Sequence, residues 1–423
     1  MDDKKKLDFF LYLYNKDPNT FIKIISRYFS FTENEIDEYS EHINFSFLID
    51  NRSIIWSERL IDKYKDKFIW KRDYKVNKHF LSLTENPNLP WNDGFLDKYS
   101  EYLDWGSISF NCKLPIPWTI ELIHKYNDKI DWDSFSFNSN ERIPWTIDFI
   151  ENNKDKLAWY DDALSNNTAL PWSIEFIKKY EDKWTWYEDG IAWNFGIPWS
   201  IDLIEVFIDK WCWIDLLRNR YVKWDLKMID RFINYINWDY LNQNEWINYS
   251  PELIYKYNDF LNWDNISSSK FFSNSKFIKE FYSKLDWSVL SFNENISWSI
   301  DLIDEYNNKW NYSNISSNVT IPWSLNLIEK YKNQLNWELI IENPYIPWSI
   351  EFITKYKLEQ YLNKDIFINK INYNNNFSYD FELIYFLKEY LHLEKILYGK
   401  YAYRNLFAPY LTTNIIKKIL FKE

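Results

Sequence analysis

The chain has 423 residues, of which 46% are hydrophobic and 21% aromatic, so it can form a core and lacks the composition of a disordered protein. Its formal net charge of -12, from 62 acidic and 50 basic residues, disfavours nucleic acid and anionic membrane surfaces as partners. Its two cysteines, Cys112 and Cys212, give no disulfide framework and indicate a reducing, cytoplasmic compartment.

Residues 1–30 predict an N-terminal helical cap. Three lysines precede a short apolar run, but Asp8 interrupts the run and no small-residue cleavage site follows it. We therefore expect an amphipathic helix rather than a signal peptide. No stretch of eighteen uninterrupted apolar residues occurs in the sequence, so no membrane-spanning helix is predicted.

Residues 31–362 predict one array of short repeats. Tryptophans recur in pairs fourteen residues apart, and most pairs follow one another at intervals of 24–27 residues. Periods of this size indicate units that pack only on their neighbours, and the regular register of the rings with Leu and Ile indicates core positions. The expected core tryptophans are Trp118, Trp132, Trp145, Trp159, Trp172, Trp186, Trp199 and Trp213.

The repeat that begins at Trp118 illustrates the first half of a unit. Apolar residues lie 0, 4, 5, 8 and 12 positions after its start, which predicts an amphipathic helix of about three turns. Thr119 is a good N-cap, Glu121 suits the first turn and Lys129 the last turn of such a helix. Ser or Thr follows the first Trp in most units, so the same helix start recurs along the array.

The second half, from Trp132 to Asn138, predicts a helix of one or two turns with Asp131 as its N-cap. Because the chain has only 5 glycines, we expect the closing Asn to adopt the left-handed conformation that ends many helices. The predicted fold is all-α, a solenoid of helix-turn-helix repeats. An alternative is a leucine-rich α/β horseshoe with a strand at Leu290-Ser291-Phe292 and its counterparts.

Two segments depart from the period. An insertion at about residues 71–88 is locally basic and is predicted either to project as a binding loop or to be a solvated loop without a partner. Residues 363–423 lack the Trp pairs but keep amphipathic helical patterns, which predicts a C-terminal helical cap. The basic candidates for partner binding in the insertion are Lys71, Arg72, Lys75 and Lys78.

Motifs for chemistry are sparse. The four histidines are scattered, and the sequence has neither a glycine-rich phosphate loop nor a nucleophile elbow. We therefore predict that the protein is not an enzyme and uses no metal or cofactor. A regular acidic series in consecutive units either complements the helix dipoles or forms a stripe that recruits a basic partner. Its members are Glu121, Asp148, Glu175 and Asp202.

The unit Ile-Pro-Trp-Ser-Ile-x-Leu/Phe-Ile-x-x-Tyr, followed by Asp/Asn-Trp-x-x-Leu-Ser-x-Asn, resembles Trp-rich short-repeat arrays in uncharacterised proteins of AT-rich genomes. The resemblance covers about residues 31–362 and implies architecture without an active site. We expect a monomeric scaffold that binds a protein or peptide, basic in character, along the concave face of a right-handed solenoid. Alternatives are an immunity-like inhibitor that masks a basic enzyme site and a carbohydrate-binding array.

Overall fold

The computed structural model describes residues 3–71, 82–159, 163–187, 189–358, 360, 381–399 and 402–421. The chain divides into two units, one of residues 1–55 and 272–423 and the other of Trp56–Phe271. The described residues form helices and turns, and none of them forms a strand. The predicted all-α repeat fold is confirmed. The leucine-rich alternative is wrong, since Leu290-Ser291-Phe292 lies in helix α20 (Trp287–Phe292).

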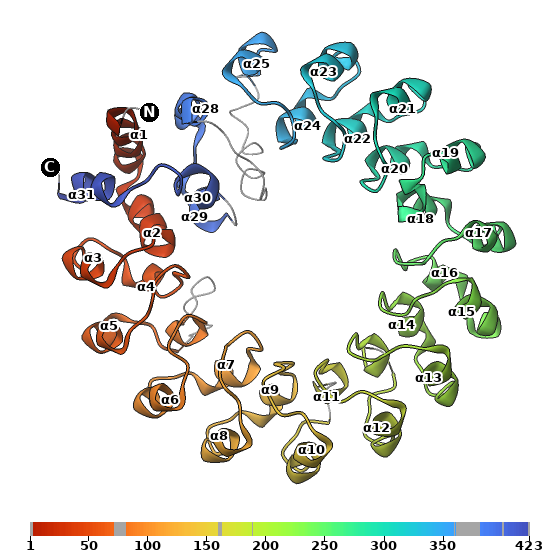
Figure 1. The fold of residues 1–423 in the computed structure, drawn as a ribbon, viewed down its shortest axis with the longest axis horizontal. Coiled ribbons are helices and arrows are strands. Elements are labelled where there is room, and N and C mark those ends of the chain that lie inside the picture. The colour runs from red at the N-terminus through yellow and green to blue at the C-terminus, as the bar shows by residue number, and fades with distance from the viewer. Residues whose placement is uncertain are drawn as a thin grey trace. The chain divides into compact units, whose positions relative to one another are not determined.

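Within each unit the first helices of the repeats form one layer and the second helices form another (Figure 1). The first helices are α3 (Glu33–Glu38), α5 (Glu58–Tyr64), α6 (Asp93–Tyr99), α8 (Ile120–Lys125), α10 (Ile147–Asn153), α12 (Ile174–Lys179), α13 (Ile201–Val206), α15 (Leu226–Arg231), α17 (Pro251–Tyr257), α19 (Lys276–Glu280), α21 (Ile300–Glu305), α23 (Leu325–Tyr331) and α25 (Ile350–Lys355).

The second helices are shorter on average, and two of them are single 3₁₀ turns. They are α4 (Phe45–Leu48), η2 (Leu83–Glu85), α7 (Trp105–Phe110), α9 (Trp132–Ser136), α11 (Ala163–Asn166), η3 (Ile191–Trp193), α14 (Trp213–Arg218), α16 (Trp238–Leu241), α18 (Trp263–Ser268), α20, α22 (Tyr312–Ser317) and α24 (Trp337–Glu342). Further 3₁₀ turns are η1 (Lys65–Lys67), η4 (Ile233–Tyr235), η5 (Lys270–Ser273) and η6 (Lys388–Tyr390).

The first helices begin where the sequence predicts and end earlier. The Thr119 hydroxyl accepts a hydrogen bond from the Leu122 backbone at 3.1 Å, which confirms Thr119 as the N-cap of α8. The prediction of three turns is wrong, because α8 has only six residues. The chain leaves the helix at Tyr126, and the Trp132 indole donates Nε1–H to the Asn127 carbonyl at 3.2 Å. The indole thus satisfies a carbonyl of the turn that follows the short helix.

Second helices are joined to the next repeat by a buried hydroxyl. Asp131 caps α9 as predicted, with its carboxylate accepting from the Ser134 backbone. Ser136 in the same helix donates to the Trp132 carbonyl at 2.7 Å and accepts from the Ala158 backbone of the following repeat at 2.9 Å. Thr84 takes this role in η2, because it donates to the Trp70 carbonyl and accepts from the Asp104 backbone.

Asparagine closes the second helices through its side chain. The expected left-handed conformation is wrong, since Asn219, Asn293 and Asn318 have φ of -65°, -66° and -71°. Buried Asn167 instead donates to the Ser136 and Asn138 carbonyls at 2.9 and 3.2 Å and accepts from the Ala169 backbone. We call the equivalent residues the asparagine ladder. Its members are Asn51, Asn138, Asn167, Asn194, Asn219, Asn244, Asn318 and Asn343.

The first helices are linked by a second repeating contact. The Glu151 carboxylate of α10 accepts from Tyr180 Oη at 2.7 Å and pairs with Lys179 Nζ at 3.0 Å, from the C-cap and the last residue of α12. An acid, a lysine and a tyrosine meet in the same way at five other junctions between repeats. These acids are Asp62, Asp97, Asp230, Asp304 and Glu329.

The second tryptophans of the pairs, at or before the start of the second helices, bridge neighbouring repeats and are half-buried. Trp159 lies 4.9 Å from Tyr180 of the next repeat, ring centre to ring centre, and Lys183 Nζ lies 5.3 Å from the Trp159 ring. Trp186 and Trp213 contact rings of the next repeat in the same way, Lys156 of the next repeat lies over the Trp132 ring, and Trp199 is also half-buried. The expected core residues Trp118, Trp145 and Trp172 are buried.

The N-terminal helices α1 (Asp3–Lys16) and α2 (Pro18–Tyr28) pack on the C-terminal helices within the same unit. Phe9 contacts Phe381, and Tyr28 stacks on Tyr403 with ring centres 5.1 Å apart. Tyr28 Oη also donates to the Leu397 carbonyl at 2.8 Å. The C-terminal helices are α28 (Phe381–Phe386), α29 (Leu393–Tyr398), α30 (Ala402–Leu406) and α31 (Thr413–Phe421).

Asn167→Ala should destabilise the protein by about 3 kcal/mol, because it removes the side-chain partner of the buried Ser136 carbonyl and of the Ala169 N–H, and one of the two bonds to the Asn138 carbonyl. Chemical denaturation followed by circular dichroism measures the loss. The control is Asn152→Ala, which removes an exposed amide from α10 and should change stability by less than about 0.5 kcal/mol. Equal effects of the two substitutions would contradict a structural role for the ladder.

Stability should be constant above pH 5 and fall as the pH drops from 4.5 to 2. Hydrogen bonding from Tyr180 and Lys179 lowers the pKa of Glu151 from its ordinary value of 4.5 to about 2, and Lys332, Tyr356 and Lys355 do the same for Glu329. A carboxyl group whose pKa is lower in the folded state than in the unfolded state stabilises the fold at a pH above its unfolded-state pKa. This contribution disappears as the pH falls and the carboxylate is protonated.

Thermal unfolding between pH 2 and pH 7 measures this dependence. The double variant Glu151→Gln, Glu329→Gln should be less stable at pH 7 and lose less stability on acidification. A variant with the same acid sensitivity as the parent would show that other carboxylates control acid unfolding.

Candidate functional site

The predicted acidic series lies in the layer of first helices. Glu121, Asp148, Glu175 and Asp202 are exposed in the first turns of α8, α10, α12 and α13, and none forms an ion pair with another described residue. Hydrogen bonds from its own backbone N–H and from Thr119 lower the pKa of Glu121. These hydrogen bonds at the start of α8 therefore explain, at least in part, why an acid occupies position 121.

A second row of exposed acids has the same spacing just beyond the C-terminal ends of the same helices. It comprises Asp128, Asp155, Asp182 and Asp209, each seven residues after a member of the first series. The two rows have equal charge and similar exposure, so the second provides a matched control for the first.

The basic insertion is described only at its edge. Lys71 is exposed, whereas Arg72, Lys75 and Lys78 lie outside the described residues. Residues 83–86, within the range expected for the insertion, form η2 and its asparagine turn. Of the predicted basic group, the structure therefore places only Lys71.

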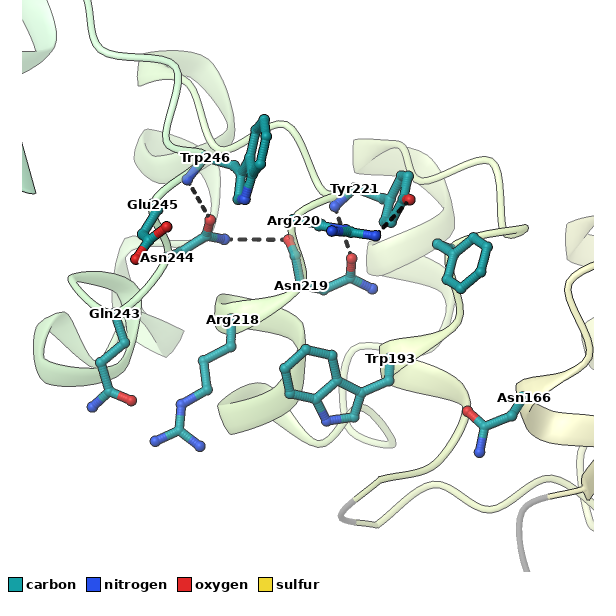
Figure 2. A pocket seen from close by; sticks show the side chains of 11 residues that line it. Asn166, Trp193, Arg218, Asn219, Arg220, Tyr221, Gln243, Asn244, Glu245 and Trp246 are labelled. Atoms are coloured by element: carbon teal, nitrogen blue, oxygen red, sulfur yellow. Dashed lines mark hydrogen bonds between the residues drawn. The ribbon is translucent and has the colours of Figure 1, made fainter. Parts of the chain in front are cut away.

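A pocket of about 540 Å³ lies on the layer of second helices in the unit Trp56–Phe271. Its walls come from the ends of consecutive second helices and the turns that follow the ladder residues. In Figure 2, Gln243, Arg218, Trp193 and Asn166 extend in a row along one side, and Trp246 and Tyr221 lie on the other. We call these the polar row and the aromatic side of the pocket.

The aromatic side is exposed to solvent. Trp246 is 55% exposed, and it is the only tryptophan among the described residues that is mainly exposed. Phe195 and Tyr221 are 54% and 43% exposed and stack on each other with ring centres 5.0 Å apart. Three neighbouring exposed rings on consecutive turns give a flat surface that an apolar or planar group can cover.

The polar row is rich in hydrogen-bond donors. Trp193 Nε1 and Arg218 Nε are buried, and neither has a hydrogen-bond partner among the described residues. Arg218 lies over the Tyr240 ring at 4.8 Å, while Arg220, also in the pocket wall, donates to Tyr221 Oη at 3.1 Å. Among the described residues, Glu245 is the one acid in the wall. The wall therefore carries two guanidinium groups against one carboxylate.

The asparagine ladder fixes the turns that carry these side chains. Asn219 and Asn244 each accept from the backbone N–H two residues later, at Tyr221 and Trp246. Asn244 also donates to the Asn219 carbonyl at 3.2 Å, which ties the two turns together (Figure 2). The positions of the aromatic side chains thus follow from the same bonds that join the repeats.

Two local features bring the edge of the pocket close to neighbouring repeats. Gly196 follows Phe195, and a Cβ at this position would lie 2.3 Å from the Thr168 carbonyl oxygen, so only glycine permits the approach. Asp189 has a φ of 60°, in the left-handed region, and its carbonyl accepts from the Asn166 side chain at 3.2 Å. Its N–H donates to buried Asp215 at 3.0 Å. Such bonds hold an unfavourable backbone conformation in place.

The sequence predictions did not include this pocket. Apart from Asn219 and Asn244, its residues lie one or two positions before or after a ladder asparagine, where no side chain recurs in the repeat pattern. A usable signal was present, because Phe195, Tyr221 and Trp246 are aromatic residues outside the repeating apolar positions in three consecutive units. Trp246 in particular breaks the fourteen-residue pairing.

Within the described ranges, no three His, Cys, Asp or Glu side chains are grouped as a metal site would require. No helix in the described part of the chain has the length and apolar character needed to cross a bilayer. Comparisons with protein-family models, curated proteins and solved structures found no match to this chain.

Neutralising the first acidic row by Glu121→Gln, Asp148→Asn, Glu175→Gln and Asp202→Asn should weaken binding of an octalysine peptide at low salt more than neutralising the second row. A stripe formed by the first row concentrates the local potential, whereas an effect of net charge alone would be equal for the two variants. Fluorescence polarisation measures the affinities. Equal weakening by both variants would leave helix capping as the role of the first row.

Proposed function

We propose that this protein is a non-catalytic interaction scaffold that binds a segment of a partner protein in the pocket between Trp193 and Trp246. The observation that supports the proposal is the group of three exposed aromatic rings beside two arginines on consecutive turns. Exposed aromatic and arginine side chains are the types that contribute most to protein-protein binding.

The pocket wall also favours binding over catalysis. The described residues of the wall include one carboxylate, no histidine and no cysteine, so they offer no pair of groups for acid-base or nucleophilic chemistry. The turns are held by buried hydrogen bonds, so little ordering of the protein is needed when a ligand binds.

An immunity-like inhibitor is a second candidate function. It is favoured by the exposed acidic series, which would face the basic site of an enzyme. The acidic series and the pocket lie in different layers of helices, so the two candidate functions can be tested separately.

Panning a display library of random dodecapeptides on the immobilised full-length chain tests the proposal. We expect enriched peptides whose affinity falls at least tenfold with Trp246→Ala, because loss of a central aromatic contact in an interface costs about 2 kcal/mol. Isothermal titration with the synthetic peptides measures the change.

The matched control is Tyr345→Ala. Tyr345 occupies the same position in the turn after Asn343 that Trp246 occupies after Asn244, it is 45% exposed, and it is outside the pocket. Peptide binding should survive this substitution. Enrichment of no peptide, or equal losses from Trp246→Ala and Tyr345→Ala, would contradict the proposed function.

A further inference from the structure

We infer that the pocket recognises a carboxylate next to an apolar or aromatic side chain in the bound segment. This inference rests on the proposed function and adds the chemistry of the partner. It differs from the basic partner that the net charge of the whole chain favours, because the pocket has a different charge balance from the rest of the protein.

The charge of the pocket is the first argument. In the described part of the chain, the pocket wall holds Arg218 and Arg220 and one acid, Glu245, although the formal net charge of the whole chain is -12. Lys270 Nζ lies 5.7 Å from the Trp246 ring and adds a further positive charge at this edge. A local excess of positive charge on an acidic protein favours an anionic group at this place.

Unused donors are the second argument. Trp193 Nε1 and Arg218 Nε are both buried and lack a partner among the described residues. A buried donor without an acceptor costs about 1–3 kcal/mol, and a ligand oxygen would remove that cost. Trp172 and Trp199 donate Nε1–H to the carbonyls of the ladder residues Asn167 and Asn194, whereas Trp193 lies directly before Asn194, at another position of the repeat, and makes no such bond.

The kind of acceptor follows from the donors. A guanidinium presents parallel N–H groups that match the two oxygens of a carboxylate, and such charge-assisted pairs are stronger than neutral hydrogen bonds. A neutral sugar offers hydroxyls that donate as well as accept, and it would use acidic and amide acceptors. The pocket wall has more donors than acceptors, which favours a carboxylate over a sugar.

The aromatic side supplies the second half of the recognition. Trp246 and Tyr221 lie opposite the polar row (Figure 2), and Phe195 stacks on Tyr221, so a ligand that fills the pocket meets charge on one side and rings on the other. A volume of about 540 Å³ is within the range of pockets that enclose small organic ligands, and it suits a few residues of a peptide.

Fluorescein-labelled hexapeptides test the inference by polarisation on the full-length protein. Each probe contains one Trp in a Gly/Ser background and one Glu placed one, two or three residues away, with an amidated C-terminus. A matched set carries Gln in place of Glu, and a third set carries Gln with a free C-terminal carboxylate. The third set distinguishes a side-chain carboxylate from a chain terminus.

At least one carboxylate-containing probe should bind tenfold or more tightly than its amidated Gln counterpart, and the difference should shrink at high salt. Arg218→Gln should remove the preference, and Arg218→Lys should restore only part of it, because lysine keeps the charge without the paired donors. Since Arg218 is partly buried, exposed Arg220→Gln serves as a second variant that should also reduce the preference.

The control is Arg142→Gln, which changes an exposed arginine in an inter-repeat turn outside the pocket and should leave binding unchanged. Equal binding of Glu and Gln probes, or a preference that survives both Arg218→Gln and Arg220→Gln, would overturn the inference. The proposed function would still stand if peptides selected from the library depended on Trp246. If neutral oligosaccharides bound in a Trp246-dependent way and no peptide did, both proposals would fall.

Discussion

Satisfying the backbone polar groups of very short helices is the constraint on which the fold depends. A helix leaves its first four N–H groups and last four carbonyls without partners, so a six-residue helix such as α8 satisfies few of its own groups. Side chains supply the rest: hydroxyl and carboxylate caps at the starts, indoles at the ends, and buried serine and asparagine between repeats. The fold is therefore a hydrogen-bonded array as much as a hydrophobic one.

Local features of this array could be predicted from sequence, and features that involve the next repeat could not. Thr119 and Asp131 act as N-caps because capping depends on residues three positions away. The end of α8 and the conformation of the ladder residues depend on contacts beyond the helix, and both predictions were wrong. Asn167 uses its amide to bind carbonyls of the preceding repeat, a partner that no local rule for helix termini includes.

The same distinction applies to the candidate site. The acidic series could be located on first turns because its position within the repeat is regular, whereas the pocket gathers side chains from successive turns where the repeat is irregular. An array in which the ladder positions are constrained leaves the neighbouring positions free to vary. Arg218 and Tyr221 flank Asn219, and Gln243 and Trp246 flank Asn244. Residues that differ from repeat to repeat are therefore held in place by asparagines that recur in the repeats.

The packing of the terminal helices has a consequence for biosynthesis. Tyr28 bonds the carbonyl of Leu397, 369 residues later in the chain, and buried Phe9 and Phe21 contact rings from the C-terminal helices. At about 5–20 residues per second, a ribosome needs roughly 20–75 s to make that intervening length. During this time the apolar faces of α1 and α2 have been synthesised but their final partners have not. These apolar faces must be kept from other contacts in the nascent chain. They are therefore a defined surface for a chaperone to bind.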